Sequence, residues 1–318
     1  MDDNLLSLLD GRTDQVGGLC FETFMVGLEE RVNTTYGPSL EMDFRLSDSG
    51  QADIVYVPPL AVVPTEPFTL DAQVIAWLKQ QYEGGALICA ACTGTLALGA
   101  SGLLDGQPAT THWAFADLFS RLYPGVDLRA ERTLIAGGRD MRLVTAGAHA
   151  SWHDLMLYLI HRYAGAASAR RVAKLFLLDW HELDQNAYSC FRENFQHEDA
   201  VIRSAQQWFA DNLSHPEPVK AMLERVQIPQ RSFQRRFRQA TGHTPVGYIQ
   251  HLRVEEAKNL LESTELSVED SAWRIGYEDP AYFRQIFRRI TGMTPARYRK
   301  AFRTPPDVLQ LLPAQESQ

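Results

Sequence analysis

The carboxyl-terminal third of the chain contains QRSFQRRFRQATGHTPVGYIQHLR at residues 230–253 and PAYFRQIFRRITGMTPARYRKAFR at residues 280–303. The two stretches align without gaps, and nine of their 24 positions are identical. Two copies are too few for a solenoid, which needs about three or more stacked repeats to bury a continuous core. The repeat instead predicts a duplicated helix-turn-helix, with the second helix of each copy inside the aligned stretch.

Each of these second helices has two chemically different faces. Phe233 and Phe237 lie four positions apart, as do Phe283 and Phe287, which places each pair on one helix face that must be buried. The opposite faces carry Arg231, Gln234, Arg235 and Arg238 in the first copy and Arg284, Gln285 and Arg288 in the second. No acidic residue occurs from 230 to 254 or from 280 to 303.

A helix with an acid-free arginine and glutamine face suits the major groove of double-stranded DNA. Arginine offers two parallel donors to guanine, and glutamine can pair with adenine. The remaining arginines neutralise phosphates. The alternative is a solvated basic face on a small helical bundle. Two such faces at a fixed offset favour DNA binding, and we therefore expect the seven polar residues to contact promoter DNA.

The charge is distributed unevenly along the chain. Residues 198–303 hold 17 Lys and Arg against 13 Asp and Glu, whereas the remainder holds 14 against 26. The net charge of −8 therefore conceals a positive module on an acidic body. This asymmetry also favours a nucleic-acid partner for the module.

Turn and cap residues support the same helices. In the second copy, Asp279 is placed to cap the second helix and Pro280 to occupy its first position. Gly242 and Gly292 follow the two second helices, where a left-handed residue commonly ends a helix. Between the copies, one apolar stripe of a linking helix is formed by Val254, Ala257 and Leu261.

These features resemble the DNA-binding domain of AraC/XylS-type transcription regulators. The resemblance covers residues 199–303 and is most specific in GYEDPAYFRQIFRRITGMTPARYR. It implies an all-α domain of seven helices with two helix-turn-helix motifs, whose recognition helices enter successive major grooves about 34 Å apart. The sequence departs from the family at Ile228-Pro229, where a serine cap is usual, and we expect Pro229 at the first helical position instead.

The amino-terminal body alternates between strand-like and helix-like runs. Strands are predicted at 54–57, 86–90 and 143–145, and helices at 70–81, 113–122 and 152–163. Such alternation is typical of an α/β domain with a largely parallel sheet. The uncharged run 84–104 has the length of a membrane span, but its five glycines favour a strand, a tight turn and a helix, and we expect no membrane contact.

The sharpest feature of this body is LICAACTGT at residues 87–95. A strand leads into a tight turn in which Cys92 takes the place of an exposed nucleophile, and the following helix N-terminus should lower the pKa of its thiol. His112 follows at the end of a predicted strand. Because ligands of α/β sheets bind at the carboxyl ends of strands, we predict a pocket lined by Cys92, Thr93, His112 and Trp113.

This half resembles the class I glutamine-amidotransferase-like superfamily, in the intracellular-protease-like branch that is fused to AraC modules in GlxA-like regulators. The resemblance rests on ACTGTLALGASGLLDGQPATTHW and TAGAHASWHDLMLYLI. It implies a flavodoxin-like sandwich in which Cys92 and His112 match a nucleophile and its assisting histidine. No residue matches the acid that orients the histidine. Pro58-Pro59 replaces a Pro-Gly loop, and only Leu5–Leu9, Asp14 and Gly17-Gly18 match the first strand and its turn. We therefore expect vestigial chemistry at most.

Other interpretations of the cysteines and histidines stay open at this stage. Cys92 is a nucleophile if the chain is a cysteine-dependent hydrolase or amidase tethered to DNA, and it is an oxidisable thiol if the chain is a redox sensor. It is a small buried apolar residue if neither holds.

Cys89 and Cys92 have the CxxC spacing, but no second ligand pair follows. The four-residue spacing of His149 and His153, with His161 nearby, permits metal binding, although ordinary surface or core histidines are the simpler interpretation, and we expect no metal.

The chain is accordingly divided into a ligand-sensing domain at 1–178, a linker at 179–198, a DNA-binding domain at 199–303 and a loose tail at 304–318. We predict a cytoplasmic transcription regulator, since four cysteines form no disulfide framework and no secretory signal is visible. Its expected partners are double-stranded promoter DNA, a small nitrogenous effector and a second copy of the chain in a homodimer. Contact with RNA polymerase is left open, and no cofactor is expected.

Overall fold

The computed structural model describes residues 21–34, 37–63, 68–181 and 184–303. The described residues form two compact units: unit 1 ends at Gln185, and unit 2 begins at Asn186. The division falls inside the stretch 179–198, and each unit is described by itself. The expected remnants of a first strand, at Leu5–Leu9 and as far as Gly18, lie outside the described residues, as does the expected tail.

Unit 1 is built on a four-stranded sheet with the order β5-β6-β10-β9. The strands are β5 (Ile54–Val57), β6 (Leu87–Ala91), β10 (Leu143–Ala146) and β9 (Leu134–Gly137). β5, β6 and β10 are parallel to their neighbours, whereas β9 pairs antiparallel with β10. The predicted α/β domain with a largely parallel sheet is therefore confirmed, although the sequence patterns did not predict the antiparallel edge strand.

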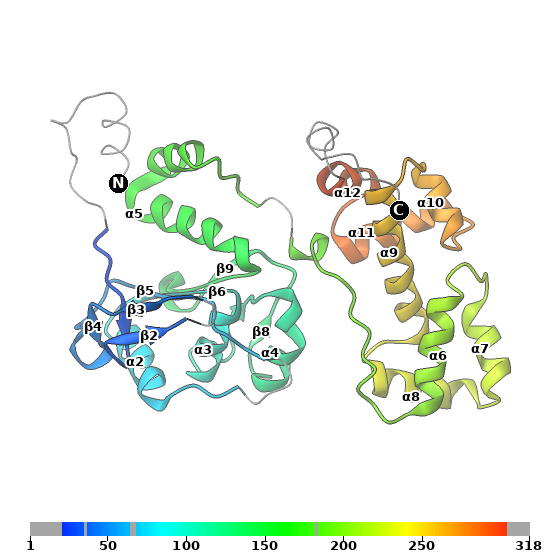
Figure 1. Cartoon of the computed structure of the whole chain (residues 1–318), viewed down its shortest axis with the longest axis horizontal. Coiled ribbons are helices and arrows are strands. Elements are labelled where there is room, and N and C mark those ends of the chain that lie inside the picture. The colour runs from blue at the N-terminus through cyan, green and yellow to red at the C-terminus, as the bar shows by residue number, and fades with distance from the viewer. Residues whose placement is uncertain (1–20, 35–36, 64–67, 182–183, 304–318) are drawn as a thin grey trace. The chain divides into compact units, whose positions relative to one another are not determined.

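β6 is central because all five of its residues are apolar and buried. Successive side chains of a strand point to opposite faces, so Ile88 and Ala90 join one apolar cluster while Leu87, Cys89 and Ala91 join the other. The first cluster includes residues of α2 (Ala72–Glu83), α3 (Thr95–Ala100) and α4 (Ala116–Leu122), and the second includes residues of α5 (Trp152–Leu175). The sheet is thus covered by helices on both faces (Figure 1).

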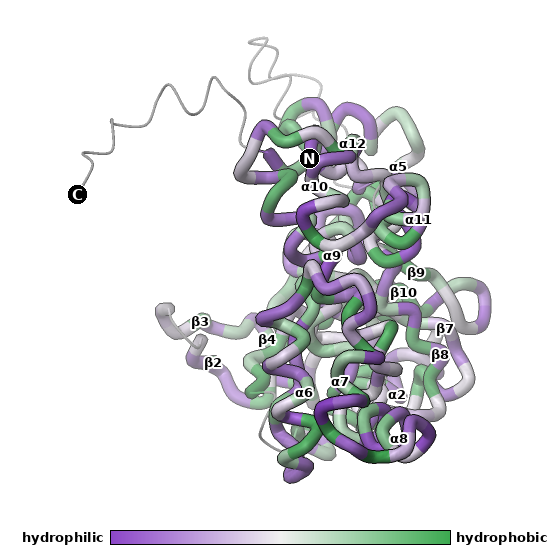
Figure 2. Tube along the Cα trace, turned by 90° about the vertical axis from the view of Figure 1, so that its right-hand side faces the viewer, coloured by the Kyte–Doolittle hydropathy of each residue, from purple (hydrophilic) through white to green (hydrophobic). Residues whose placement is uncertain are grey.

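Three short strand pairs lie outside this sheet: β1 (Val26–Gly27) with β4 (Phe44–Arg45), β2 (Arg31–Asn33) with β3 (Ser39–Glu41), and β7 (Pro108–Ala109) with β8 (Asp127–Leu128). The β2–β3 hairpin projects from the rest of unit 1 (Figure 2). Every residue of these two strands is exposed.

The uncharged run from residue 84 to 104 forms β6, the turn Cys92–Gly94 and α3, as its glycines predict. No helix in the described part of the chain has the length and apolar character required to cross a bilayer. α5 is longer than the expected 152–163 and bends at Gly165, whose φ is 82°.

Unit 2 contains seven helices between Asn186 and Arg303: α6 (Ala200–Asp211), α7 (Pro218–Val226), α8 (Gln230–Thr241), α9 (Pro245–Ser263), α10 (Val268–Arg274), α11 (Pro280–Thr291) and α12 (Pro295–Phe302). α9 runs between the group α6–α8 and the group α10–α12 (Figure 1). The predicted all-α domain with two helix-turn-helix motifs is confirmed.

The sequence repeat is also a structural repeat. Gly242 and Gly292 end α8 and α11 with φ of 79° and 78°. Thr244 and Thr294 then cap α9 and α12 through their side chains. Each copy is closed by the same type of aromatic contact: the Phe237 and Tyr248 rings are 5.2 Å apart, and their counterparts in the second copy are 5.4 Å apart.

The helix starts differ between the copies. In the second copy the Asp279 carboxylate accepts the backbone N–H of Ala281 at 2.8 Å, and Pro280 is the first residue of α11, as predicted. In the first copy Pro229 is the cap residue and α8 begins at Gln230, so its expected place at the first helical position is wrong by one residue. The extended ψ of 136° at Pro229 places it before the helix rather than within it.

The second copy provides a direct test of its core. Phe287 is fully buried between Phe283 and Tyr298, so Phe287→Ala should destabilise unit 2 by about 3–5 kcal/mol, because it removes a large apolar side chain and leaves a cavity. Chemical denaturation, monitored by circular dichroism, measures this change in the free energy of unfolding. Tyr282→Ala is the matched control, since Tyr282 lies on the same helix but is 46% exposed. Equal losses in the two variants would contradict the packing described here.

Candidate functional sites

The arginine and glutamine face of α8 is exposed as the sequence predicts. Phe233 and Phe237 are completely buried, whereas Arg231, Gln234, Arg235 and Arg238 are all exposed. The tube of α8 accordingly alternates between hydrophilic and hydrophobic colours (Figure 2). Arg236 is different: its guanidinium donates two hydrogen bonds, of 2.8 and 2.7 Å, to Asp199, and it holds α8 against the start of α6.

α11 presents the corresponding face in the second copy. Arg284, Gln285 and Arg288 are exposed, as predicted. Together with Arg289 and Thr294 they line a surface depression. Arg284 also forms an ion pair with Glu269 on α10, so that any phosphate or base that binds Arg284 must compete with this carboxylate.

Arg253 of α9 links the two copies, a role that the sequence patterns did not suggest. Its guanidinium donates to the carbonyl oxygens of Leu213 and His215, both at 2.8 Å, in the segment between α6 and α7. The same group lies over the Tyr277 ring, 5.0 Å from its centre, in the turn before α11. Burial lowers the pKa of Arg253. The buried guanidinium of Arg253, on α9, therefore contacts both the segment between α6 and α7 in the first copy and the turn before α11 in the second copy.

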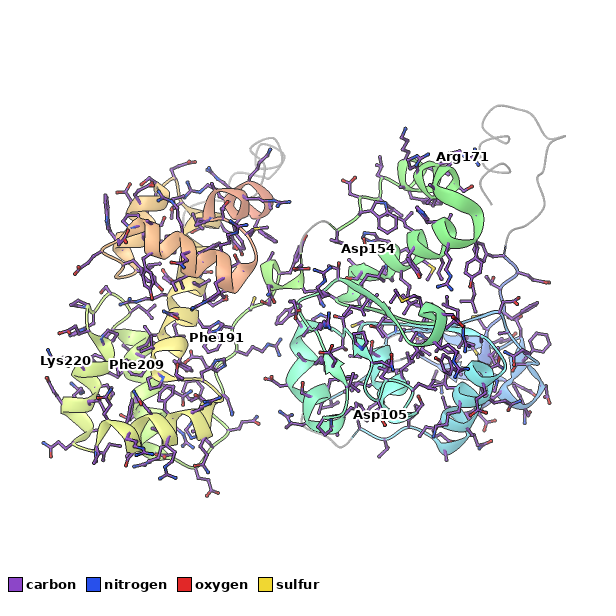
Figure 3. The ribbon with its side chains drawn as sticks, turned by 180° about the vertical axis from the view of Figure 1, so that it is seen from behind. Asp105, Asp154, Arg171, Phe191, Phe209 and Lys220 are labelled. Carbon is purple, nitrogen blue, oxygen red and sulfur yellow. The ribbon has the colours of Figure 1, made fainter. Side chains whose placement is uncertain are left out.

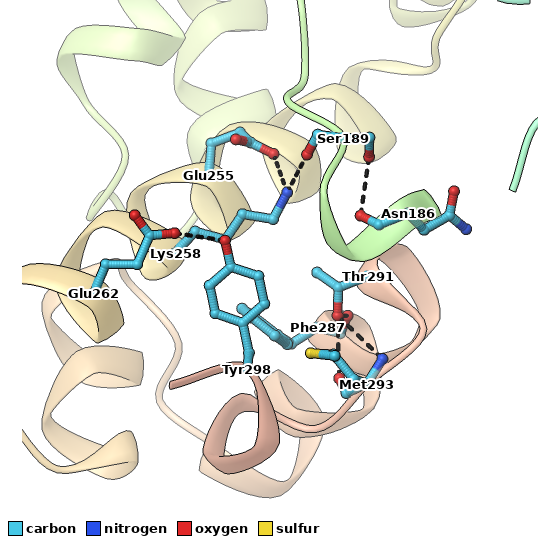
Figure 4. A network of polar contacts seen from close by, with 9 residues as sticks. All are labelled: Asn186, Ser189, Glu255, Lys258, Glu262, Phe287, Thr291, Met293 and Tyr298. Atoms are coloured by element: carbon cyan, nitrogen blue, oxygen red, sulfur yellow. Dashed lines mark hydrogen bonds and ion pairs between the residues drawn. The ribbon is translucent and has the colours of Figure 1, made fainter. Parts of the chain in front are cut away.

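The stretch after Asn186 is anchored to α9 by polar and aromatic contacts. The Lys258 ammonium is almost completely buried and donates to the Ser189 carbonyl at 2.6 Å and to Glu255 at 2.8 Å (Figure 4). Phe191 stacks on His251 with ring centres 4.9 Å apart. Figure 3 labels Phe191 among the helices of unit 2. These contacts make residues 189–191 part of the packed unit.

In unit 1, the turn after β6 has the strained geometry of an elbow. Cys92 has a positive φ of 57° and is 4% exposed. Gly94 permits the tight return, because a Cβ at this position would lie 2.5 Å from the Pro58 carbonyl oxygen. The Thr93 hydroxyl accepts the Leu60 N–H at 2.9 Å and donates to the Leu60 carbonyl at 2.7 Å, so it fastens the loop after β5.

The second predicted segment lies against this elbow. The Thr111 hydroxyl donates to the Cys92 carbonyl at 2.9 Å, which brings the residue next to His112 into direct contact with the elbow. His112 caps the short helix Trp113–Phe115, and its Nδ1 accepts the Ala114 N–H at 3.0 Å. The structure therefore brings together the segments of the four residues predicted to form a pocket.

Gln185, the last residue of unit 1, connects this region to its surroundings. Its side-chain amide nitrogen, which has two hydrogens to donate, lies within 3.1 Å of four acceptors: Thr110 Oγ1 and the carbonyl oxygens of Thr111, Ala130 and Arg132. Its amide oxygen accepts the Ala148 N–H at 2.7 Å. A single glutamine in an unpatterned stretch carries no sequence signal, which explains why it was not predicted.

A separate hollow in unit 1 is found near the amino ends of β6 and β10, where the antiparallel β9 ends, whereas the elbow follows the carboxyl end of β6. It is lined by Tyr82, Glu83, Gly102, Leu103, Gln107, Gly138, Arg139, Arg142 and Leu143. Arg142 donates to the carbonyl oxygens of Tyr82 and Ala86, so its charge is already used to join α2, β6 and β10.

Comparison with known proteins identifies both halves. Residues 222–301 match the helix-turn-helix domain family, and residues 16–162 match the DJ-1/PfpI family. The transcriptional regulator CdhR of Pseudomonas aeruginosa is 30% identical over 275 residues, which are 83% of this chain and 76% of CdhR. The chain is a DJ-1/PfpI-type regulator of the AraC helix-turn-helix family.

Two further matches extend the comparison of this AraC-family regulator. The regulator GlxA of Rhizobium meliloti is 26% identical over 65% of this chain and 63% of its own length. The solved DNA-binding domain of AdpA, in complex with a target DNA, is 34% identical and covers 32% of this chain and 92% of that domain, with a TM-score of 0.31.

In the DJ-1/PfpI domain of this regulator, the electrostatics of the elbow differ from the sequence-based expectation. Burial raises the pKa of the Cys92 thiol, and the hydrogen bonds with Thr93 only partly oppose that effect. The prediction that the helix N-terminus lowers this pKa is therefore wrong, because desolvation of the thiolate is the larger contribution. Burial also raises the pKa of Cys89.

The raised pKa makes a prediction about thiol reactivity, since only the thiolate alkylates rapidly. Iodoacetamide near pH 8 should label Cys190, which is exposed, much faster than Cys92 in the native protein. Peptide mass spectrometry after timed quenching measures both rates. Labelling of Cys92 at the rate of Cys190 would contradict a buried thiol whose pKa is raised. The same comparison in denaturant is the control, in which the two rates should converge.

Proposed function

We propose that this AraC-family regulator binds promoter DNA by inserting α8 and α11 into two major grooves. The observation that carries the proposal is the pair of exposed arginine and glutamine faces on two repeat-related helices, each held over a buried phenylalanine pair. Arg231, Gln234, Arg235 and Arg238 contact one groove, and Arg284, Gln285 and Arg288 contact the other. Arginine supplies both guanine recognition and phosphate neutralisation.

The linking helix supports binding on one face of the duplex. The 19 residues of α9 extend over about 28 Å at the usual rise of an α-helix, which is similar to the spacing of about 34 Å between successive major grooves. The buried Arg253 joins both copies through this helix. The two recognition helices are therefore presented as a rigid pair.

Replacing Arg235 with Ala should weaken promoter binding by about 1–3 kcal/mol, about 5–150-fold in Kd, if it reads a base. The loss should be specific to one base position in a panel of substituted operators, as measured by fluorescence anisotropy at fixed salt. Arg129→Ala removes the same charge from an exposed position in unit 1 and should change little. An equal loss on all sequences would make Arg235 a phosphate contact. Full-length protein without salt-sensitive binding to any promoter fragment would overturn the proposed function.

We propose further that unit 1 is a sensor of a small molecule rather than an enzyme. Because His112 Nδ1 accepts a backbone N–H, the neutral ring carries its proton on Nε2, and neither nitrogen is then free to remove the Cys92 proton. The raised pKa of Cys92 also disfavours a thiolate nucleophile. The buried Thr95 hydroxyl, three residues after Cys92, has no hydrogen-bond partner among the described residues. A polar ligand or a water molecule would supply that partner.

The effector that best fits the elbow is a small nitrogenous compound. Trp113 adjoins His112, with ring centres 5.2 Å apart, and an indole face attracts ammonium groups. Effector binding at Cys92, Thr93, His112 and Trp113 would act on Thr111 and thus on Gln185, where the chain leaves unit 1. The effector shifts the equilibrium between two arrangements only by its different affinity for each.

We also propose that the regulator works as a cytoplasmic homodimer. Apolar side chains on the first four strands are unusually exposed for a water-facing surface, among them Leu40 at 41% and Phe44 at 40%. A second copy of the chain would cover them, as exposed apolar patches often mark an interface. Dimerisation would also double the number of recognition helices on an operator.

A thermal-shift screen of the full chain against amino acids, amines and quaternary ammonium compounds tests the sensor proposal. A true effector present at about 100 times its Kd should stabilise unit 1 by about 2.7 kcal/mol. Trp113→Ala should abolish that shift, while Trp152→Ala, which removes an exposed tryptophan of α5, should preserve it. Conversion of the compound by the wild type but not by Cys92→Ala would establish an enzyme instead.

A further inference from the structure

A cluster of two histidines and one aspartate lies apart from the elbow and the DNA-facing helices. His153 and Asp154 are in the first turn of α5, and His181 follows in the stretch between α5 and Gln185. Each residue offers one ligand atom, and these atoms all lie within 4.8 Å of one another. Figure 3 labels Asp154 on the α5 ribbon.

The aspartate at the centre of this cluster is 3% exposed. Its Oδ1 accepts the backbone N–H of His181 at 2.9 Å, and its Oδ2 is 2.5 Å from His181 Nδ1. The His153 and His181 rings lie 4.7 Å apart at 30°, and His153 Nε2 is 3.2 Å from the Asp179 carbonyl oxygen. A buried carboxylate is thus enclosed by two imidazoles from separate segments of the chain.

We propose that His153, Asp154 and His181 bind one divalent transition-metal ion, with Zn²⁺ as the best match. Imidazole nitrogen and carboxylate oxygen are typical ligands of Zn²⁺, whereas Ca²⁺ and Mg²⁺ select oxygen. In a tetrahedral zinc site the ligand atoms are roughly 3.3–3.6 Å apart. Small side-chain rotations would bring the cluster to that spacing. They would lengthen the 2.5 Å contact between Asp154 and His181 and shorten the longer distances among the ligand atoms, which reach at most 4.8 Å. Three protein ligands leave the fourth position to water.

A hydrogen bond between aspartate and histidine involves only two of the three residues, and His153 makes a separate contact with the Asp179 carbonyl oxygen. Asp154 and His181 satisfy that bond by themselves, yet His153 is stacked beside them. The sequence drew attention to His149 and His153 because they are four residues apart, but His149 is exposed and outside the cluster. The partner of His153 is instead His181, which is 28 positions further along the chain, and no local spacing predicts that pairing.

The position of the site gives the ion a structural effect. It joins the start of α5 to the stretch that leads, four residues later, to the buried Gln185. An ion bound there stabilises the end of unit 1 by adding bonds that the unfolded chain lacks. This inference depends on neither promoter binding nor the effector.

Zn²⁺ binding to the full chain, stripped of metal by chelation, tests the proposal. The Cys20→Ser and Cys190→Ser background removes two thiols that would otherwise compete as ligands. We expect one equivalent of Zn²⁺ per chain in competition with a chromophoric chelator, and an increase in melting temperature. His153→Ala and His181→Ala should each lower the affinity at least about tenfold and remove the melting shift.

His161→Ala is the matched control, because His161 is an exposed histidine of α5 outside the cluster, and it should bind as the parent does. Asp154→Asn tests the carboxylate, and its circular dichroism spectrum shows whether the fold is intact. Co²⁺ should give the visible absorption of a tetrahedral site in the parent and lose it in His181→Ala. The proposal is overturned if no stoichiometric ion binds, or if His153→Ala and His181→Ala bind as tightly as His161→Ala.

Discussion

Burial of an aromatic pair under each recognition helix is the constraint on which the DNA-binding unit depends. Phe233 and Phe237, and their counterparts Phe283 and Phe287, are all completely inaccessible. An α-helix that buries one face must present the opposite face to solvent, and in both helices that face carries exposed arginine and glutamine side chains. The glycine after each helix and the capping threonine that follows then turn the chain into the next helix at the same point in both copies. The chemistry of the surface thus follows from the packing beneath it.

Unit 1 has a comparable organisation around the strained turn at Cys92. The positive φ of Cys92 is maintained because Thr93 holds the loop after β5 and Thr111 holds the Cys92 carbonyl. The side-chain amide nitrogen of Gln185 contacts the carbonyl oxygens of Thr111 and Arg132, and Gln185 is the last residue of unit 1. If the elbow binds the effector as proposed, this connection links the binding site to the point at which the chain leaves unit 1. Burial raises the pKa of Cys92, which agrees with the proposed binding role better than with nucleophilic catalysis.

Local patterns predicted the elements whose determinants are close together in the sequence. The repeat of residues 230–253 and 280–303 predicted both recognition helices and their glycine ends, and the apolar run before Cys92 predicted the central strand. Contacts between distant residues escaped prediction: Arg253 with the Leu213 carbonyl, Gln185 with Thr111, and His181 with Asp154. Each depends on where the fold brings two segments together, which no periodicity encodes. The pKa of Cys92 was predicted in the wrong direction for a related reason, because its burial arises from the tertiary structure rather than from its own turn.

Hydroxyl-radical footprinting of the full-length protein on an operator tests the central claim most directly, because it reports where both recognition helices meet the duplex. Two rigidly linked helices in successive major grooves predict two protected regions about 10–10.5 base pairs apart on the same face of the DNA for each chain bound. The protection at one region should weaken when the arginines of α8 are replaced, and at the other when those of α11 are replaced. A single protected region per chain, or two regions on opposite faces of the duplex, would contradict the account.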